Sequence, residues 1–578
     1  MSQNEKSGET AEFDFIVVGS GMSGGWVAKE LCERGFKVAV VERGREIKPK
    51  VDYTDFEDPW DHEHLNMRHM GETNKKDYPI QSEVYAFHNY TKQFWVKDTE
   101  HPYEVPEGQD YKWRRGYHTG GRSIMWGRQS YRLSEIDFTA NKREDIAVDW
   151  PIRYKDIAPW YDHVEKFAGI SGSKEGLEIL PDSVFQPPHD LTCAEQDFKA
   201  KVEAAFPGRK VIPGRVANLT EPTKEQLDLG RGKCQARDLC FRGCSFGAYF
   251  SSVSATLPAA KRTGNLTLIT DVAVHKLVHD PKTNRVTGIE GVNTKTMAGI
   301  SITGRAVFLN ASTIPTSLIL LNSKSEAFPN GLANSSGQVG HNLMDHCSGA
   351  RVRGRMPGNQ DKYHYGRRPN GFYIPRFRNH TEEGEGFMRG FGYQGRILRS
   401  GWNGRAQGSA GVGTEYKKAM RSPGDWYMSI VAFGEILPRF SNHIRPHATK
   451  TDKWGFPIPI IDAKQSQNEI NLIRQATKDA RAMMTAAGAE IESGDDPETA
   501  MPSVPGNGIH EMGTARMGRD PKTSVLNGFN QSHDVPNLFI SDGSFMTSAG
   551  CQNPSLGYMA FSARAADHAG KLMKDGRI

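Results

Sequence analysis

The 578-residue sequence lacks several features that mark other classes of protein. It contains no run of about 18 apolar residues, so we expect no transmembrane helix. Its first twelve residues are polar and lack the apolar segment of a signal peptide. The formal charge of +5 is small for this length, which argues against nucleic acid as a partner. The sequence therefore predicts a soluble chain made in the cytoplasm, and any export would depend on a signal carried by a partner.

Cysteine is scarce, and its distribution argues against a disulfide framework. Seven cysteines are present, an odd number, and four of them are isolated in the sequence. The other three, Cys234, Cys240 and Cys244, lie within eleven residues. Three thiolates without an obvious fourth suit an iron–sulfur cluster that lacks one corner, or a zinc site completed by a distant residue. Because the spacing is not that of ferredoxins, buried free thiols remain the alternative.

The clearest motif that is present lies near the N-terminus. Residues 14–44 contain an apolar, β-branched run, a glycine-rich turn, a segment of helical composition and a second apolar run. The glycines suit a dinucleotide site, because Gly19 allows a tight turn and Gly21 lets a pyrophosphate approach the backbone. Gly24 would let the helix and the strand pack closely. The N-terminus of the helix would offer unpaired N–H groups to the phosphates.

An acidic residue at the end of the second apolar run limits which dinucleotide cofactors can bind. Glu42 follows the glycine loop by about 20 residues and can accept a hydrogen bond from a ribose 2′-hydroxyl, which argues against NADP. Because strand, helix, strand and acid occur in order, we predict a dinucleotide site rather than a chance glycine-rich turn. The expected contacts in this region are Gly19, Gly21, Ser23, Gly24, Glu42 and Arg43.

Two further segments have compositions that suit a binding site. Residues 116–127 contain adjacent glycines, a serine and a further glycine, which suit a backbone that passes close to a flat or phosphorylated ligand. Taken alone, this pattern is equally consistent with an ordinary loop. Residues 52–110 are rich in His, Tyr and Trp and have no clean period, so they form either an irregular insertion that lines a site or a solvated surface loop.

The second half of the chain predicts a different kind of sheet. Residues 371–434 alternate aromatic and β-branched residues with Gly, Arg and Asn, which indicates an antiparallel sheet in a second, substrate-facing domain. Helices are expected over residues 313–322 and 467–487.

The last eighty residues carry a short strand and a terminal helix. Residues 538–540 predict a buried strand that ends in Asp542-Gly543, a turn placed to contact a cofactor. Asn553-Pro554 is expected to cap the terminal helix. His510 stands alone, and a lone histidine is more often a satisfied polar group than a catalytic one.

Four motif regions in this order resemble the glucose–methanol–choline (GMC) family of FAD-dependent oxidoreductases. Gly19–Gly24 with Glu42 is similar to the family's ADP-binding unit. The other matching segments are Gly120-Gly121-x-Ser123-x-x-Trp126-Gly127, Gly340-x-Asn342-Leu343-x-Asp345-His346, His510-x-x-Gly513-Thr514-x-Arg516-Met517-Gly518, Asp542-Gly543-Ser544 and Asn553-Pro554. They are similar to the family's flavin loop, its joint between domains and its C-terminal signature.

The resemblance implies an α/β fold with two domains. The first would be a Rossmann-like FAD-binding domain made of residues 11–150, 210–345 and 500–578, with the cysteine loop near 234–248. The second would be an antiparallel-sheet substrate domain made of residues 151–209 and 346–499, and the 52–110 insertion would line the site. Further FAD contacts are implied at Gly121, Ser123, Trp126, Gly127, Val272, Asp542, Gly543 and Asn553. Met125 matches the position at which pyranose oxidases carry a covalently bound His, so noncovalent FAD is implied.

The resemblance also implies the chemistry. A substrate C–H bond would be broken by hydride transfer to the flavin N5, while His510 takes the hydroxyl proton and Asn553 orients the oxygen. Hydride leaves an alcohol carbon only when negative charge builds on the oxygen, so a base and a hydrogen-bond donor must both face that oxygen. Because Asn cannot take a proton, His510 is the expected base.

The cysteines narrow the subtype. Their spacing, followed by Gly247-Ala248, resembles the catalytic subunits of bacterial sugar dehydrogenases, in which three cysteines hold a 3Fe–4S cluster that passes electrons to a cytochrome. Such enzymes pair with a small subunit that carries a twin-arginine export signal, which would make this chain periplasmic and associated with a membrane only through partners. Without such a partner it would be cytoplasmic.

The substrate is less closely defined. Glucoside 3-dehydrogenases, which oxidise C3 of glucosides to 3-keto sugars, are the preferred comparison, with gluconate 2-dehydrogenase and glucose 1-dehydrogenase as alternatives. An oxygen-using sugar oxidase and a flavin-free homologue are the rivals, although intact His510, Asn553 and glycine loop argue against the latter. Glu435, Arg439 and His443 could line the substrate pocket, and a role at a strand edge is at least as consistent with their positions.

Overall fold

The computed structural model describes residues 12–58, 60–62, 72–363, 369–401, 405, 411–421 and 423–578. Residue 11, part of the 52–110 insertion and parts of the 346–499 segment, all included in the expected domains, lie outside the described residues. Within the described ranges, no helix combines the length and the apolar composition needed to cross a membrane.

The N-terminal motif forms the centre of a largely parallel sheet. Its strands are β1 (Phe13–Val18), β2 (Val38–Val41), β4 (Leu266–Ile269), β5 (Val272–Asp280), β6 (Arg285–Asn293), β7 (Gly299–Leu309) and β15 (Leu538–Phe539). The order is β4-β2-β1-β7-β6-β5, with β15 also paired to β7. The β1, β2, β4, β7 and β15 pairings are parallel, whereas β5, β6 and β7 form an antiparallel extension. Apolar residues on both faces of β1 are buried, as the uninterrupted apolar run predicts.

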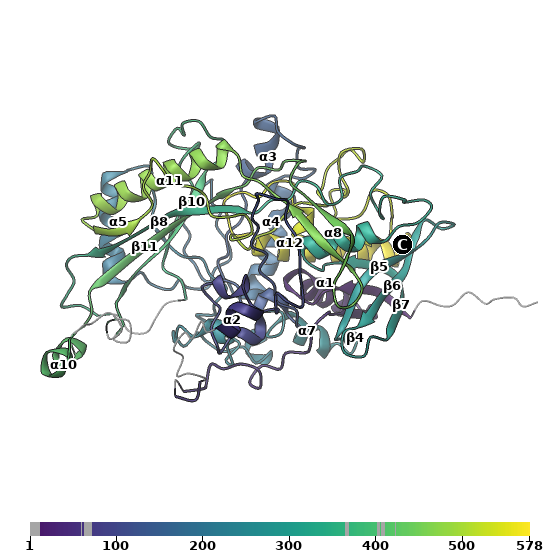
Figure 1. Cartoon of the computed structure of the whole chain (residues 1–578), viewed down its shortest axis with the longest axis horizontal. Helices are drawn as coiled ribbons and strands as arrows, with labels where there is room; N and C mark the ends of the chain where they lie inside the picture. Colours follow the sequence, from purple (N-terminus) through teal and green to yellow (C-terminus); the bar gives the residue numbers. More distant parts are fainter. Residues whose placement is uncertain are drawn as a thin grey trace, which may run out of the picture.

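Helices cover this sheet and complete its core. They are α1 (Met22–Glu33), α4 (Tyr154–Ala168), α7 (Thr256–Arg262), α8 (Thr313–Asn322) and α12 (Ser555–Lys574). α1 packs against both α7 and α12, and α12 packs against α4. In Figure 1 these helices lie with the strands β4 to β7 on the right of the molecule. The expected helix over 313–322 is present with those bounds.

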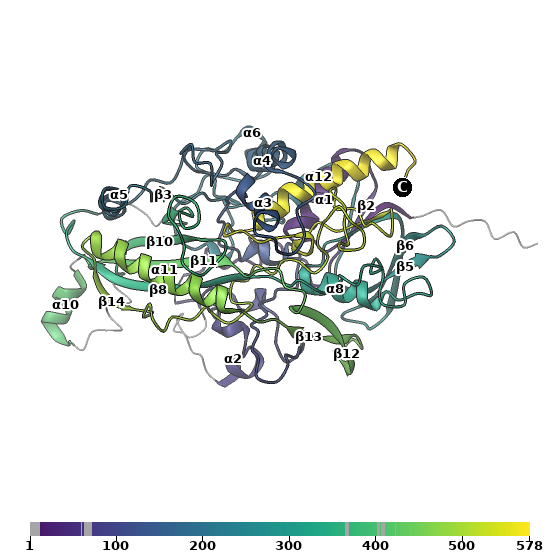
Figure 2. The ribbon, with the colours of Figure 1, turned by 90° about the horizontal axis from the view of Figure 1, so that it is seen from above.

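A second sheet of six strands lies on the opposite side of the molecule (Figures 1 and 2). Its strands, in spatial order, are β14 (Glu490–Gly494), β8 (His346–Met356), β11 (Trp426–Glu435), β10 (Phe391–Arg399), β9 (Phe372–Ile374) and β3 (Ile212–Pro213). All of these pairings are antiparallel. α11 (Gln467–Ala486) packs on β8 and β11, and α5 (Cys193–Ala205) packs on α11 and β10. The prediction of a Rossmann-like sheet joined to an antiparallel sheet is confirmed.

Several smaller elements lie outside the two sheets. A separate hairpin of β12 (His443–Thr451) and β13 (Pro457–Asp462) packs against α8. The remaining α-helices are α2 (Glu72–Asp77), α3 (Glu135–Arg143), α6 (Lys224–Asp228) and α10 (Gly413–Arg421). α4 shares a hydrophobic core with the parallel sheet, whereas α5 shares one with the antiparallel sheet, so residues 151–209 divide between the two cores. The expected domain boundaries themselves stay a prediction.

Candidate active site

The first glycine loop joins β1 to α1. Gly19 has φ +98°, and a Cβ there would overlap the carbonyl oxygen of Asn310, so only glycine fits this turn. A Cβ at Gly24 would overlap the carbonyl oxygen of Gly19, which is the close contact of helix and strand that the motif predicts. Gly21 differs, because a Cβ there would meet no described atom closer than 4.0 Å. The protein itself therefore does not require a glycine at this position, and the open space suits a bound group.

The second glycine loop faces the first. The hydroxyl of Ser20 accepts the N–H of Gly120 at 3.0 Å, and a Cβ at Gly121 would lie 3.7 Å from the Cα of Gly21. Ser123 donates to the Gly120 carbonyl at 2.6 Å and accepts the N–H of Ser252 at 3.0 Å. The two loops, which lie about a hundred residues apart in the chain, thus lie directly against each other.

The N-terminus of α1 lies at the contact between the two loops. Its N-cap is Gly21, which has no side chain to cap the helix, and the first turn contains no acidic residue. Ser23 is buried in that first turn. The free N–H groups and the positive end of the helix dipole form a ready site for phosphate, so the residues present fit the pyrophosphate of a dinucleotide.

Glu42 follows β2 directly and contacts the first glycine loop. The Glu42 carboxylate accepts hydrogen bonds from the N–H groups of Ser20 and Gly44, both at 3.1 Å, and burial raises its pKa. Val272 at the start of β5 donates its N–H to the Glu42 carbonyl at 3.0 Å. The structure thus brings Glu42 and Val272 together, and their expected contact with the cofactor stays a prediction.

Arg43 lines a cavity of about 550 Å³ that is partly open to solvent. Its guanidinium lies 4.6 Å from the ring centres of both Tyr117 and Trp454, and it pairs with Asp452 at 3.1 Å. The cavity also contacts His101, from the 52–110 segment. Arg43 is therefore held by aromatic rings and a carboxylate next to the end of β2.

Four of the other expected cofactor contacts hold the loops in place. The Trp126 indole donates to the Phe250 carbonyl at 2.9 Å, and the Gly127 carbonyl accepts from the Asn370 side chain at 3.0 Å. Asp542 is buried, and its carboxylate accepts from the Thr316 hydroxyl at 2.6 Å and from the N–H and hydroxyl of Ser544. A Cβ at Gly543 would overlap the Glu511 carbonyl oxygen, so this turn packs directly against the segment that carries His510.

His510 and Asn553 meet at the junction of the two sheets. Nε2 of His510 lies 3.4 Å from Nδ2 of Asn553. Gln394 of β10 donates from its side-chain amide to Oδ1 of Asn553 at 2.7 Å, and this contact directs the Asn553 NH₂ group toward His510. The N-cap of α12 is Pro554 and has no side-chain hydrogen bond, so the expected capping role for the Asn553 side chain is wrong. That side chain faces the histidine instead.

His510 is partly exposed, and its surroundings favour the neutral imidazole. Burial of its ring within the protein, with smaller contributions from His346 and Arg122, holds the pKa of His510 well below its usual range. A neutral imidazole at neutral pH can accept a proton, which a charged one cannot.

Two residues that sequence reasoning left without a role position His510. Asp345 is buried, and its carboxylate accepts the backbone N–H groups of His346, Gly506, Gly508 and His510 at 2.7 to 3.0 Å. Nδ1 of His346 lies 2.8 Å from Nδ1 of His510. Both residues end the Gly340–His346 motif, so the motif itself was the signal that could have found them. Gln394 had no such signal, because it is one polar residue in an alternating strand.

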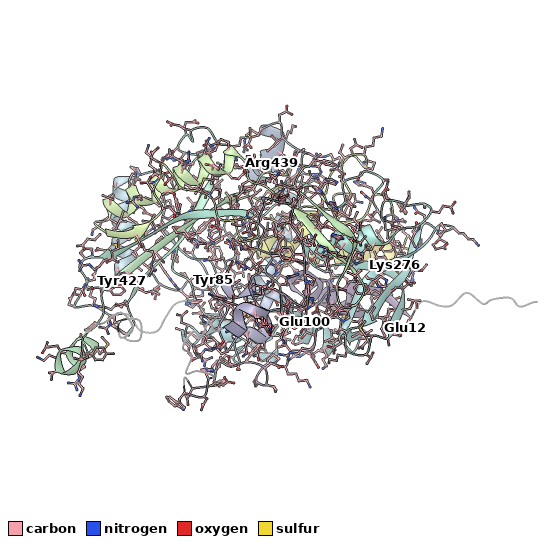
Figure 3. The ribbon with its side chains drawn as sticks, in the orientation of Figure 1. Glu12, Tyr85, Glu100, Lys276, Tyr427 and Arg439 are labelled. Atoms are coloured by element: carbon pink, nitrogen blue, oxygen red, sulfur yellow. The ribbon has the colours of Figure 1, made fainter. Side chains whose placement is uncertain are left out.

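The three candidate pocket residues, Glu435, Arg439 and His443, do not lie together. Glu435 is buried and accepts the N–H groups of Ala549 and Gly550 at 2.9 and 3.2 Å, so it braces the turn before Asn553. Arg439 pairs with Glu469 at 2.6 Å near the start of α11 (Figure 3), and His443 contacts the Ser441 carbonyl at 2.9 Å. Glu435 therefore supports the site from behind, while Arg439 and His443 occupy positions at the edges of elements.

The three clustered cysteines line one cavity of about 380 Å³. Burial and the neighbouring thiols raise the pKa of Cys234 and Cys244. Arg231 is 1% exposed and donates only to the carbonyls of Phe167, Ala168 and Gly247, and burial lowers its pKa to about 9. Among the described residues it has no carboxylate partner, so an anionic group at Cys244 would offset its charge.

The cysteine geometry does not form a site for one metal ion. No group of three or more His, Cys, Asp or Glu side chains in the described ranges is arranged to hold an ion, which disfavours the zinc alternative. The thiols surround a cavity rather than converge on a point, and the arrangement by itself does not support the cluster expected from the spacing.

The described part of the 52–110 insertion contacts the cysteine loop. Asp55 pairs with Arg237 at 2.5 Å and accepts from the N–H and hydroxyl of Ser245. Within its described residues, the insertion makes no hydrogen bond to His510 or Asn553.

Both the N-terminal and the C-terminal part of the chain match a known protein family. The N- and C-terminal sequence patterns of GMC oxidoreductases match residues 13–348 and 438–562. A 2-methyl-1,2-propanediol dehydrogenase from Mycolicibacterium austroafricanum is 28% identical over 97% of this chain and 96% of its own length. The fructose dehydrogenase large subunit of Gluconobacter japonicus is 26% identical over 99% and 100%. A gluconate 2-dehydrogenase flavoprotein from Pantoea cypripedii is 23% identical over 95% and 92%.

Among solved structures, the pyridoxine 4-oxidase from Mesorbium loti superposes with a TM-score of 0.60 at 16% identity. The match covers 96% of this chain and 99% of that one, and it shows the shared fold.

Proposed function

The chain belongs to the GMC oxidoreductase family, and on that premise we propose that it is an FAD-dependent dehydrogenase of sugars or glycosides. Members of this family bind FAD and act on CH–OH donors. The proposed reaction is oxidation of a secondary or anomeric hydroxyl, with C3 of glucosides as the preferred position and a 3-keto sugar as the product. Gluconate C2 and glucose C1 are the alternatives, and a full-length relative named a gluconate 2-dehydrogenase flavoprotein favours keeping the first of these.

One observation supports the chemistry most directly: a neutral histidine and an oriented amide lie next to each other. His510 Nε2 and Asn553 Nδ2 lie 3.4 Å apart, and Gln394 holds the amide so that a donor, not an acceptor, faces the histidine. A substrate hydroxyl that reaches this pair can give its proton to His510 and accept a hydrogen bond from Asn553. Bound FAD would supply the hydride acceptor.

The two glycine loops and the N-terminus of α1 would hold the FAD pyrophosphate, and Glu42 would accept from the ribose. We propose that FAD is bound noncovalently. Met125 occupies the position of the covalent histidine in pyranose oxidases. The histidine of the flavin loop, His118, is buried and already contacts the carbonyls of Phe94 and Thr119.

We also propose that Cys234, Cys240 and Cys244 hold a 3Fe–4S cluster through which electrons leave. The proposal rests on the resemblance of their spacing. The cavity that the three thiols line would give such a cluster room, and an anionic cluster would offset the buried charge of Arg231 beside Cys244. The chain that follows these cysteines runs along the flavin loop, because Tyr249 donates to the Ile124 carbonyl at 2.8 Å. The acceptor would be a cytochrome c or a similar protein.

We further propose a partner subunit that carries a twin-arginine signal and takes the chain to the periplasm. The relative from Gluconobacter japonicus is named as a large subunit, which supports a partner. Contact with a membrane would come only through such partners. A chain without this partner would act in the cytoplasm.

The test is anaerobic reduction of the bound flavin, followed at its visible absorbance. The substrate panel is a methyl glucoside, glucose, gluconate and fructose, with product analysis by mass spectrometry and NMR. We expect flavin reduction by at least one sugar and a 3-keto product from the glucoside. Reduction by none of them would overturn the proposed function.

Iron content and an electron paramagnetic resonance spectrum of the oxidised protein test the cluster. A cluster signal with about three irons per chain would support the dehydrogenase. Protein without iron that forms hydrogen peroxide as fast as its flavin is reduced would instead be an oxidase.

A further inference from the structure

A second histidine lies directly against the proposed base. We propose that His346 is a positioning residue that keeps a proton on Nδ1 of His510, so that Nε2 is the nitrogen that accepts the substrate proton. This inference rests on the proposed function of His510. It follows from the hydrogen-bonding capacities of four groups in a row: the Gly550 carbonyl, His346, His510 and Asn553.

The first step is the protonation state of His346. Its Nε2 lies 2.9 Å from the carbonyl oxygen of Gly550. A carbonyl oxygen can only accept, so Nε2 of His346 carries a proton. His346 is 2% exposed, and burial lowers its pKa to about 4, so the ring is neutral at neutral pH. A neutral ring with its proton on Nε2 has a lone pair on Nδ1.

The second step is the protonation state of His510. Nδ1 of His346 and Nδ1 of His510 are 2.8 Å apart, a hydrogen-bond distance that two lone pairs would not adopt. His510 must therefore donate from Nδ1. Because His510 is also neutral, its lone pair lies on Nε2, which faces the NH₂ group of Asn553. The donors and acceptors of the whole row agree with each other.

Buried groups hold the Gly550 carbonyl, the first group of this row, in place. Glu435 accepts the N–H groups of Ala549 and Gly550, and it pairs with Arg389 at 3.3 Å. Asp345 accepts the backbone N–H groups of both His346 and His510. The Gly550 carbonyl and the two histidine backbones are therefore held in register, so the contact between the rings does not depend on a mobile side chain.

The other tautomer of His510 cannot perform the reaction. With its proton on Nε2, His510 would present an N–H to the NH₂ group of Asn553, and two donors would face each other. Its lone pair would point at His346 and away from any substrate. Loss of the partner that orients a metal-binding histidine typically costs roughly 10- to 100-fold in activity, and we expect a loss of similar size here. The loss should fall on the rate of reaction, because His346 is buried and orients His510.

A matched pair of substitutions isolates this role. Asn and Leu have nearly the same shape, but His346→Asn offers an oxygen near the position of Nδ1, whereas His346→Leu offers none. We expect His346→Leu to lower the rate constant of anaerobic flavin reduction by roughly 10- to 100-fold with little change in the half-saturating substrate concentration. His346→Asn should recover most of that rate. FAD content and thermal unfolding of each variant identify any change that is merely structural.

A second measurement needs no substrate. A buried proton shared between two ring nitrogens gives a proton resonance at low field that exchanges slowly with water. We expect wild-type protein and His346→Asn to show this resonance, and His346→Leu and His510→Ala to lack it. Its absence from wild-type protein would overturn the inference even if no variant folds.

The two readouts separate the inference from the function on which it rests. If wild-type flavin is reduced by no sugar but the resonance follows the expected pattern, the proposed function fails and the tautomer assignment stands. If His346→Leu keeps both the resonance and the wild-type rate, the inference fails and the proposed function stands.

Discussion

The carboxyl ends of β1 and β2 in the parallel sheet, called the edge below, and the junction between the two sheets are assembled in different ways. At the edge, Ser20 and Glu42 are 22 positions apart, and the Ser20 hydroxyl donates a hydrogen bond to the Glu42 carboxylate. At the junction, His346 and His510 are 164 positions apart, and Gln394 and Asn553 are 159 apart. The edge is a local arrangement of one strand–helix–strand unit, whereas the junction exists only after both sheets have packed.

This difference predicts two kinds of mutational effect. Changes at the edge should alter how much FAD the protein holds, but not the rate per bound FAD. Changes at the junction should alter the rate per bound FAD and leave the FAD content unchanged. A variant at the edge that changes the rate per bound FAD, or a variant at the junction that changes the FAD content, would contradict this division.

The largest effect is expected at the junction. His510→Ala should keep FAD bound but lower flavin reduction by sugar by about 10²- to 10⁴-fold, because the substitution removes the proposed base for the hydroxyl proton. Stopped-flow reduction under anaerobic conditions measures this rate, with flavin content as the control. Normal reduction in this variant would remove His510 from the mechanism.

Cys240→Ser should separate flavin reduction from electron exit. If the three thiolates hold the electron relay, this variant should lose nearly all reduction of a one-electron acceptor while sugar still reduces the flavin at the wild-type rate. Cys193→Ser is the matched control, because Cys193 lies on α5, away from the cysteine cavity. Acceptor reduction at the native rate in Cys240→Ser would contradict the relay.

The glycines of the edge provide a pair with opposite expectations. Gly24→Ala would place a Cβ against the Gly19 carbonyl and should destabilise the apoprotein by about 3 kcal/mol or more. Gly21→Ala meets no described atom closer than 4.0 Å, so the apoprotein should unfold at the wild-type temperature but bind FAD more weakly. Calorimetry of apoprotein and flavin titration separate the two. Equal unfolding temperatures for both variants would contradict the packing argument.

The same contrast explains what sequence reasoning found. The strand, glycine loop, helix and acid of residues 14–44 were predictable because they follow one another directly in the sequence and each residue type has one physical reason. The contacts of Gly19 with Asn310 and of Ser20 with Gly120 join distant segments, and the sequence did not indicate them. Helix α11 was predictable from its period, and its observed end differs from the expected one by a single residue. The capping role for Asn553 failed because a distant residue, Gln394, turns its side chain toward His510.

Long-range partners explain the remaining omissions. His346 ends a motif that was recognised, but nothing local shows that its ring reaches His510, because that contact depends on how β8 leaves the joint between the sheets. Gln394 is a polar residue on a strand whose alternation indicates a sheet but not which face meets the site. Glu435 was a candidate for the pocket, but its place behind the turn before Asn553 was not indicated. For such residues, only the packing of the two sheets assigns a role.

Gln394 offers a smaller test at the junction. Gln394→Leu removes the donor that fixes the Asn553 amide, so the amide can rotate and present its oxygen to His510. We expect a loss of roughly 10-fold in flavin reduction, near the lower end of the range for a residue that orients a functional group. Gln394→Glu, which presents an acceptor to Asn553 when ionised, should reverse the amide and lose at least as much. An unchanged rate in both variants would mean that Asn553 is held in place without Gln394.

The smallest expected effect is a shift in the pH dependence of the flavin reduction rate. His510 works as a base only when neutral, so flavin reduction should fall as the pH decreases through the pKa of His510. Burial, His346 and Arg122 hold that pKa well below its usual range, so the rate should stay constant from neutral pH to well below pH 6.5. Arg122→Met removes one of these causes and leaves the buried Glu511 carboxylate, its ion-pair partner at 2.6 Å, uncompensated.

Both consequences of Arg122→Met favour the charged imidazole, so the acid limb of the pH profile should move to higher pH. The rate at its plateau should change much less than in His510→Ala. Lys224→Met, at a side chain that is 87% exposed, is the control for a simple change in net charge. An acid limb that moves to lower pH in Arg122→Met would contradict the assignment of the titrating group to His510, because removing a nearby cation cannot make a histidine harder to protonate.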